Sequence, residues 1–379
     1  MRATNTMRMN RDGRFVIMQV SDPQDLVNVR PAMVKMLNAA YDTVRPDLVV
    51  FTGDNILGNH LLDARIGSRK VAEGHSATLK RMELSLAHIL KPLEERNIPF
   101  AMIFGNHDDM NLVTKKEQAD IYRRYQCCLP LNNEDEDRDA ATYNIPILSA
   151  DGSKTAFNLW MMDTAWYDKC ADVCVEAIKE QAVAWYRTTE RQLRSENGGE
   201  PVSSLLFMHI PFAAQWKLCK PCSKGTKGAV PLRDGTFICL DKTKAKGVLG
   251  EPPCVCEDAF GLFDAIKENG DVMAAVSGHD HRNCFEGTAD GVRLVQTACA
   301  SFRCYGNRQR GVRVFTLDEN KPGTFETRMY TYDDLCGKGL RAQLRYLWDA
   351  DDYEKRKIGL LAGLAGAGAV ACLAAKLKK

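Results

Sequence analysis

The stretch that decides the fold runs from Asp47 to Asn55 and reads Asp-Leu-Val-Val-Phe-Thr-Gly-Asp-Asn. Its apolar run has the length of a buried strand, and the Gly-Asp-Asn that follows is typical of a turn. Comparable apolar runs stand before it, from Phe15 to Val20, and after it, from Pro99 to Phe104. Helical spacing of apolar residues from Pro31 to about Thr43 and from about Ser76 to Asn97 separates the three runs. This alternation predicts a parallel sheet covered on both faces, with its strand ends at one edge.

Polar residues follow the end of each predicted strand. The segments are Ser21-Asp22-Pro23-Gln24, Gly53-Asp54-Asn55 and Gly105-Asn106-His107-Asp108, then His209 after the run 202–208, and Gly278-His279-Asp280-His281 after the run 271–277. Taken singly, each has an ordinary explanation as a turn, a helix cap or a buried histidine. Taken together, the ordinary explanations weaken, because four of the seven histidines in the chain lie at these points.

The residue types at these strand ends predict a metal site. Carboxylate, amide oxygen and imidazole suit Mn²⁺, Fe²⁺ or Zn²⁺, and the absence of cysteine from the set argues against a soft structural site. Two such ions about 3.5–4 Å apart can share a carboxylate and a hydroxide, and that hydroxide is a strong nucleophile near neutral pH. The reaction that this chemistry indicates is hydrolysis of a phosphoester.

The ordered series of strand-end motifs resembles the calcineurin-like metallophosphoesterase family. Gly105-Asn-His-Asp-Asp109, Met208-His-Ile-Pro211 and Ser277-Gly-His-Asp-His281 are most similar to its purple-acid-phosphatase-29-like branch. The resemblance spans about Phe15 to Tyr330. It implies an α/β fold, a four-layer αββα sandwich, with a dinuclear metal site at the sheet edges.

The resemblance also implies a role for each residue. Asp54 would bridge both ions, and Asp22 and His281 would hold the first. Asn106, His209 and His279 would hold the second. His107 would act as the catalytic residue, stabilising the transition state or protonating the leaving oxygen.

Two positions depart from the family pattern. Its first motif is usually Asp-x-His, whereas Gln24 stands at the third position here, and a glutamine carbonyl is a weaker ligand than imidazole. The carboxylate that some members carry three residues after the bridging aspartate is Leu57 here. His107 must therefore be oriented by another group, for which Asp108 and Asp109 are candidates.

The bulk composition fits a globular protein without a nucleic-acid partner. The chain has 379 residues, of which 45% are hydrophobic and 26% charged. The net charge is 51 − 49 = +2, with no basic stripe interleaved with aromatics. Residues 1–14 form a polar extension without an apolar leader, so we expect the catalytic domain to be cytoplasmic and its fourteen cysteines to be reduced or metal-bound.

A Cys-, Lys- and Gly-rich insertion interrupts the predicted domain over residues 215–256. Its Cys219, Cys222, Cys254 and Cys256 have the ligand count of a structural zinc site, although thiols clustered without metal explain the same spacing.

Beyond the metal ligands, three residues are candidates for substrate binding. Arg308 and Arg310 follow a predicted strand, and an arginine fork matches phosphate oxygens, although a solvated turn explains them equally well. Asn283 stands two residues after His281 and is the third candidate.

The C-terminus predicts a membrane anchor. Residues 358–375 contain no charge and are flanked by lysines and arginine. As a helix this segment would be about 27 Å long, against roughly 30 Å of hydrocarbon core. Seven alanines and four glycines among the eighteen residues weaken insertion, and a helix packed on the domain or a tail in solution are the alternatives.

These features divide the chain into four parts: the extension 1–14, a phosphoesterase domain over 15–335, a helical linker over 336–357 and a transmembrane helix over 358–375. The predicted function is metal-dependent phosphoester hydrolysis. The alternative is a protein of the same fold with a weakened metal site and a binding or regulatory role. The substrate class, whether monoester, diester or phosphoprotein, and the oligomeric state stay open.

Overall fold

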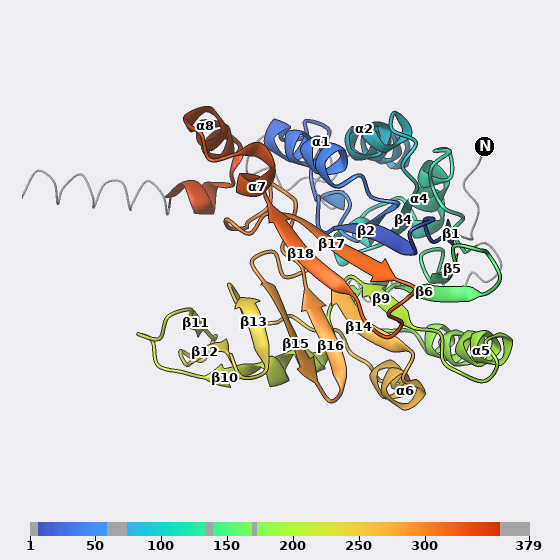
Figure 1. The fold of residues 1–379 in the computed structure, drawn as a ribbon. Helices are drawn as coiled ribbons and strands as arrows, with labels where there is room; N and C mark the ends of the chain where they lie inside the picture. Colours follow the sequence, from blue (N-terminus) through green and yellow to red (C-terminus); the bar gives the residue numbers. More distant parts are fainter. Residues whose placement is uncertain (1–6, 59–73, 133–138, 169–172, 357–379) are drawn as a thin grey trace, which may run out of the picture.

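Two β-sheets stacked between helices form the body of the molecule (Figure 1). The computed structural model describes residues 7–58, 74–132, 139–168 and 173–356. Within these ranges, α1 (Pro31–Val44), α2 (His75–Glu94) and α4 (Lys115–Tyr122) lie beside the smaller sheet, and α5 (Glu180–Glu196) and α6 (Leu262–Asn269) beside the larger one.

The smaller sheet contains the predicted β-α-β-α-β unit. Its order is β18 (Glu326–Thr331), β17 (Gly311–Asp318), β2 (Arg14–Val20), β3 (Leu48–Thr52) and β4 (Phe100–Ile103). β2, β3 and β4 are parallel, whereas β17 and β18 are antiparallel additions to the β2 edge. The short α3 (Asn106–Asp109) follows β4 directly. All five residues of β3 are buried, as the continuous apolar run of a strand covered on both faces predicts.

The larger sheet has eight strands and a parallel centre. Its order is β1 (Met7–Arg8), β5 (Tyr143–Leu148), β6 (Thr155–Met162), β9 (Ser204–Met208), β14 (Val272–Ser277), β16 (Val292–Gln296), β15 (Cys284–Ala289) and β13 (Ala245–Val248). β6, β9, β14 and β16 run parallel, so β9 and β14 present their carboxyl ends together. Those ends carry His209 and the Gly278–His281 motif.

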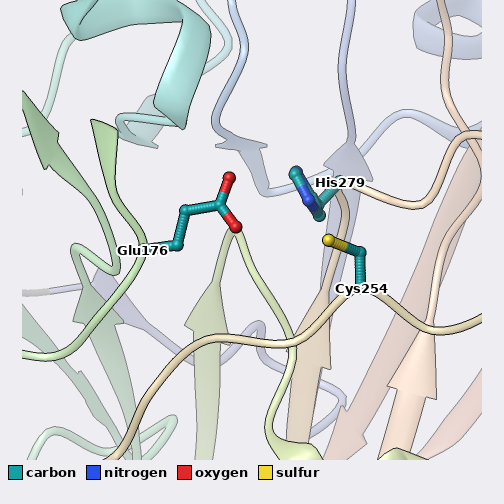
Figure 2. Close-up of side chains that lie close together, drawn as sticks. All are labelled: Glu176, Cys254 and His279. Atoms are coloured by element: carbon teal, nitrogen blue, oxygen red, sulfur yellow. The ribbon is translucent and has the colours of Figure 1, made fainter. Parts of the chain in front are cut away.

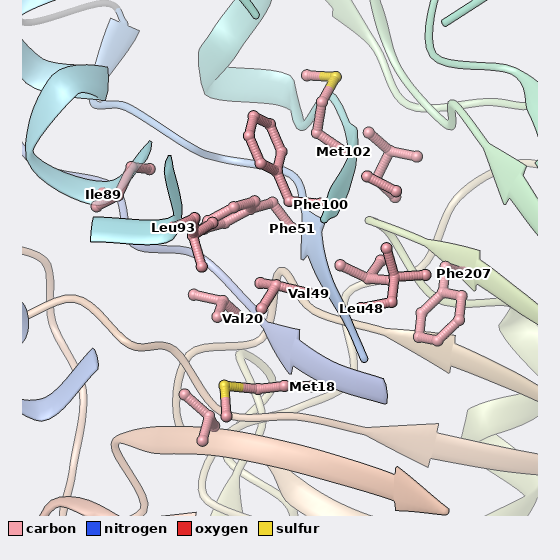
Figure 3. Packing of buried hydrophobic residues seen from close by; sticks show 14 of the residues in the cluster. Met18, Val20, Leu48, Val49, Phe51, Ile89, Leu93, Phe100, Met102 and Phe207 are labelled. Carbon is pink, nitrogen blue, oxygen red and sulfur yellow. The ribbon is translucent and has the colours of Figure 1, made fainter. Parts of the chain in front are cut away.

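Apolar contacts join the sheets and helices into four layers. Figure 3 shows the main core, in which Ile89 and Leu93 of α2 lie against Phe51 and Phe100. Across the two sheets, the rings of Phe207 and Phe315 stand 5.9 Å apart, edge to face. A second core lies between the larger sheet and α5 and α6. The helix–sheet–sheet–helix order agrees with the predicted sandwich.

The insertion has more regular structure than its sequence suggests. After η2 (Ala213–Leu218), the strands β10 (Cys219–Pro221), β12 (Phe237–Leu240) and β11 (Val230–Pro231) form a small antiparallel sheet, and a two-stranded sheet of β7 (Trp166–Asp168) and β8 (Val173–Val175) precedes α5. The three strands project from one side of the molecule (Figure 1). Only β13, at the end of the insertion, joins the larger sheet.

The segment that we expected to be a helical linker packs on the domain. It contains α8 (Leu340–Asp349), preceded by α7 (Tyr332–Cys336). Tyr346 is completely buried, and the backbone N–H of Ala32 in α1 donates a 2.7 Å hydrogen bond to Asp349. These contacts make α8 part of the helical layer over the smaller sheet.

The predicted membrane helix at 358–375 lies outside the described residues and stays a prediction. In the part of the chain that is described, we find no helix with both the length and the apolar character needed to cross a bilayer.

Candidate metal centre

Five strands bring the predicted ligands to one place between the sheets. β2, β3, β4, β9 and β14 are followed by Asp22 and Gln24, Asp54, Asn106, His209, and His279 and His281, respectively. All of these side chains are buried except that of His279, which is partly exposed. The site therefore draws on both sheets, although the residues come from segments up to 259 positions apart in the chain, 281 − 22.

Asp22, Asp54 and His281 form one half of the centre. Their ligand atoms all lie within 4.8 Å of one another. His281 Nε2 is 3.4 Å from Asp22 Oδ1, and His281 Nδ1 is 2.9 Å from the carbonyl oxygen of Tyr305. Because that carbonyl can only accept, Nδ1 carries a hydrogen, and Nε2 is the ring nitrogen that could bind an ion beside Asp22.

The other half of the centre is organised around His209 Nε2. That nitrogen is 3.1 Å from Asn106 Oδ1, 3.3 Å from His279 Nδ1 and 3.4 Å from Asp54 Oδ1. The second ring nitrogen, Nδ1, lies 2.9 Å from the carbonyl oxygen of Thr52 in β3. The backbone of β3 thus orients the imidazole, as outer partners of metal-binding histidines do.

Gln24 takes the place of the family's histidine and lies within the same cluster. Its Nε2 donates a 2.9 Å hydrogen bond to Asp54 Oδ2, while its Oε1 is buried without a hydrogen-bond partner among the described residues. Asp22 Oδ1 is likewise buried and accepts no hydrogen bond within those ranges. Buried oxygens without partners are costly in a folded protein. Two such oxygens beside His281 and Asp54 fit a cation that would be held between them.

The charges of the cluster lead to the same conclusion. Burial, followed by the charges of Asp22 and Asp108, raises the pKa of Asp54 well above its usual range. Burial also lowers the pKa of His209, and burial together with His209 lowers that of His279 to about 3. His209 and His279 are therefore favoured in the neutral state that a metal ligand requires, and a cation would relieve the repulsion that raises the pKa of Asp54. The donor set therefore fits the metals that the resemblance implies.

The backbone at the site is held in an uncommon conformation. Asp22, Gln24, Asp54 and His279 all have positive φ, at 47°, 25°, 48° and 69°. Non-glycine residues in this region cluster at functional sites, because the surrounding structure must compensate their strain. Gly105 is needed for a different reason, since a β-carbon there would overlap Asp54 Oδ1 and the backbone nitrogen of Asp54.

His107 lies at the edge of the cluster. Its backbone N–H donates a 2.9 Å hydrogen bond to Asp54 Oδ1, and its charge is among the influences that lower the pKa of His279. The carboxylate of Asp108 accepts backbone N–H groups of Gly105 and Asn55 at 2.8 and 3.0 Å. Asp108 therefore holds the turn together, whereas the imidazole of His107 is partly exposed.

The two arginines and Asn283 have structural partners. Arg310 is completely buried, and all three of its guanidinium nitrogens have hydrogen-bond acceptors: Ser301, Cys304, Asn307, Tyr346, Asp351 and Glu354. Arg308 Nη1 donates to Gln343 Oε1 at 2.7 Å, and the amide of Asn283 bonds the backbone of Gly250 and the side chain of Asp280. These contacts correct the substrate-binding interpretation of Arg310 and Asn283, and they place Arg308 against α8.

Tyr305, in the loop between β16 and β17, also contacts the site, although no motif in the sequence indicates this role. Its ring stacks on His281 at 4.3 Å, and its carbonyl oxygen is the Nδ1 partner described above. The sequence signal was an aromatic residue in the loop after a strand, which periodicity does not distinguish from any exposed tyrosine.

The four cysteines proposed for a zinc site do not meet. Within the described residues, groups of three or more metal-binding side chains include no set of cysteines. Cys222 lies beside Cys239 in the small sheet, whereas Cys254 lies beside Glu176 and His279. The described residues therefore contain no four-cysteine ligand group, which corrects the interpretation of these cysteines as a zinc site.

A model of the calcineurin-like phosphoesterase family matches residues 15–283. The chain belongs to the calcineurin-like phosphoesterase family. The matched range contains every strand end of the centre, so the resemblance inferred from the motifs is confirmed.

Three relatives are similar in sequence to this calcineurin-like phosphoesterase over most of its length. It is 26% identical to "Probable inactive purple acid phosphatase 14" of Arabidopsis thaliana over 363 residues, which cover 87% of this chain and 81% of the relative. "Probable inactive purple acid phosphatase 29" of the same plant is 26% identical, covering 83% and 79%. "Phosphatase DCR2" of Saccharomyces cerevisiae is 21% identical, covering 86% of this chain and 54% of the relative.

Proposed function

We propose that the protein hydrolyses a phosphate ester at a centre of two divalent ions. Asp22, Gln24 and His281 would hold one ion, and Asn106, His209 and His279 the other, with Asp54 shared between them. The main support for this proposal is that Asp54 lies next to both ligand sets. Its carboxylate is within reach of His209, and it also belongs to the group of Asp22 and His281. A single-ion site would not require ligands on both sides of one carboxylate.

The residues of the centre would have different roles in the proposed reaction. Bound there, the ions would neutralise phosphate oxygens and make water a nucleophile near neutral pH. The carbonyls of Thr52 and Tyr305 keep the imidazoles of His209 and His281 in the tautomer that presents Nε2 to the centre. His107, which is partly exposed at the edge of the cluster, would give a proton from its imidazole to the leaving oxygen.

His107→Ala should separate catalysis from metal binding. Because the imidazole acts on the leaving group, its loss should lower kcat by roughly 10²–10⁴, while both ions and the fold are retained. Metal analysis and steady-state kinetics check this, with the exposed His88→Ala as the matched control. Loss of metal from the His107 variant would show that this residue is a ligand instead.

Gln24→His should strengthen the first ion's site. Imidazole is a better ligand than an amide oxygen for a borderline ion, and histidine is one of the residues that tolerate the positive φ at this position. Isothermal titration with Mn²⁺ and Zn²⁺ should show tighter binding, with the exposed Gln126→His unchanged. Equal or weaker binding by Gln24→His would mean that residue 24 does not bind the ion.

The alternative function is binding or regulation without turnover. It is favoured by Gln24 in place of histidine and by the word "inactive" in the names of two relatives. Metal content and hydrolysis of a generic aryl phosphate, measured with Mn²⁺, Fe²⁺ and Zn²⁺, decide between the two. A full complement of metal without turnover on monoester, diester or phosphopeptide substrates would support the alternative.

The C-terminal segment, by the sequence argument, would attach this domain to a membrane from the cytoplasmic side. Full-length protein should fractionate with membranes, and a chain ending at Arg356 should be recovered without detergent. Full-length protein in the detergent-free supernatant would contradict the anchor.

A further inference from the structure

Three side chains with metal-binding atoms converge beside the dinuclear centre, and the proposed mechanism uses only one of them. The Glu176 carboxylate, the Cys254 sulfur and a ring nitrogen of His279 all lie within 4.8 Å of one another. Figure 2 shows the three side chains facing a common space, with Glu176 opposite His279 and Cys254. Carboxylate, thiolate and imidazole together are a ligand set that Zn²⁺ and similar thiophilic ions use.

Backbone pairing fixes the two segments that carry Glu176 and Cys254. The N–H of Glu257 donates to the carbonyl of Glu176 at 2.8 Å, and the N–H of Ile178 donates back to Glu257 at 3.1 Å. The backbone N–H of Cys254 donates to Asp280 Oδ1 at 3.1 Å, which ties the backbone of this residue to the His279–His281 loop. The three groups are therefore held in position by the fold, and their proximity does not depend on contacts between the side chains themselves.

Among the residues that the structure describes, neither Glu176 nor Cys254 has another side-chain partner. Within the described residues, the structure contains no hydrogen bond or ion pair to the side chain of Glu176 or Cys254, although Glu176 is partly buried. Burial, followed by the charges of Glu176, Asp280 and Glu251, raises the pKa of Cys254 to about 11. The same negative surroundings favour a cation at this point.

His279 is within reach of both the dinuclear centre and the pair Glu176 and Cys254. Its Nδ1 lies 3.3 Å from His209 Nε2, inside the dinuclear centre, and its ring also belongs to the group with Glu176 and Cys254. A neutral imidazole has one nitrogen lone pair for a ligand bond, because its other nitrogen carries hydrogen. One imidazole of this kind can serve only one of the two places at a time.

We propose that Glu176, Cys254 and His279 form an additional site for a thiophilic divalent cation, and that this site competes with the dinuclear centre for His279. Binding forms bonds from the ion to oxygen, sulfur and nitrogen, and the thiol proton is released to solvent. The competition rests on the assignment of His279 to the dinuclear centre, whereas the existence of the additional site does not. An ion held there removes one ligand from the second position of the centre, so it acts as an inhibitor of the proposed hydrolysis.

Cadmium ion is the probe that tests this site without measuring turnover. Titration of the full-length, reduced protein with Cd²⁺ should produce an ultraviolet charge-transfer band from thiolate to metal, part of which Cys254→Ser removes. Glu176→Gln should weaken the Cd²⁺ affinity of the Cys254-dependent site by at least about 10-fold, because mutating even an outer partner of a metal ligand lowers metal affinity by that factor. Cys222→Ser, in the cysteine pair of the small sheet, is the matched control and should leave this part unchanged.

Competition is measured by repeating the titration in excess Mn²⁺, which prefers oxygen and nitrogen ligands. The apparent affinity of the Cys254-dependent site for Cd²⁺ should fall in the wild-type protein. A Cd²⁺ band that Cys254→Ser leaves intact would overturn the site, and an affinity that Mn²⁺ does not change would overturn the sharing of His279. Since neither readout requires hydrolysis, failure of the proposed function would not be mistaken for failure of this proposal.

Discussion

Asp54→Asn should abolish metal-dependent hydrolysis while leaving the fold intact. The substitution removes the carboxylate that lies within reach of both ligand sets in the described part of the chain. At least one ion should therefore be lost, and turnover should fall by about 10³-fold or more, beyond the loss of a single charge-stabilising donor. Metal analysis by mass spectrometry and steady-state kinetics on an aryl phosphate measure the two effects.

Thermal stability of the metal-free protein distinguishes this role from a structural one. Burial and the neighbouring Asp22 and Asp108 make a charge on Asp54 unfavourable, so the neutral amide should leave the Tm of the metal-free protein unchanged or raise it. Asp234→Asn, in an exposed turn, is the control that should alter neither metal nor turnover. Normal metal content and turnover in Asp54→Asn would refute the dinuclear assignment.

Arg310→Met should be among the most destabilising substitutions in the chain. Its guanidinium is completely buried and ion-paired with Asp351, at 2.5 Å, and with Glu354, both of which are also buried. Removing the cation leaves two carboxylates uncompensated, which should lower the free energy of unfolding by about 3–5 kcal/mol. Denaturant unfolding followed by circular dichroism measures the change.

Arg308→Met is the matched control for that experiment. Arg308 lies over the ring of Tyr346 at 3.9 Å, but its side chain is 41% exposed. Its replacement should cost about 1 kcal/mol or less. Similar effects of the two substitutions would show that burial of Arg310 does not determine its contribution.

The parts that the sequence predicted well are those that local patterns determine. The strands around Val49 and Phe100 are buried on both faces and therefore read as uninterrupted apolar runs, and α1 was recognised from the helical spacing of Met33, Met36 and Leu37. The ligand set followed because parallel strands end at one edge, so residues distant in sequence can be brought together by topology alone.

The parts that the sequence did not predict depend on partners that no local pattern specifies. Arginines 308 and 310 look equivalent in sequence, yet one is exposed and the other is buried against carboxylates more than forty positions away, 351 − 310 and 354 − 310. Cys254 was grouped with Cys256 by spacing. The backbone pairing of Glu176 with Glu257 brings the segment of Cys254 to this position, and the spacing of the cysteines does not predict that pairing.

The ion pairs of Arg310 also bear on where a recombinant fragment of this protein should end. The family match stops at residue 283, and a fragment cut there would lack Arg310. A fragment cut at the end of β18 would contain Arg310 but neither of its carboxylate partners. A fragment that includes Arg310 but ends before Asp351 would lack both carboxylates that pair with this guanidinium, next to the loop that supports His281. Recombinant fragments should therefore extend through Glu354, and fragments designed from the motif boundaries alone should be expected to aggregate.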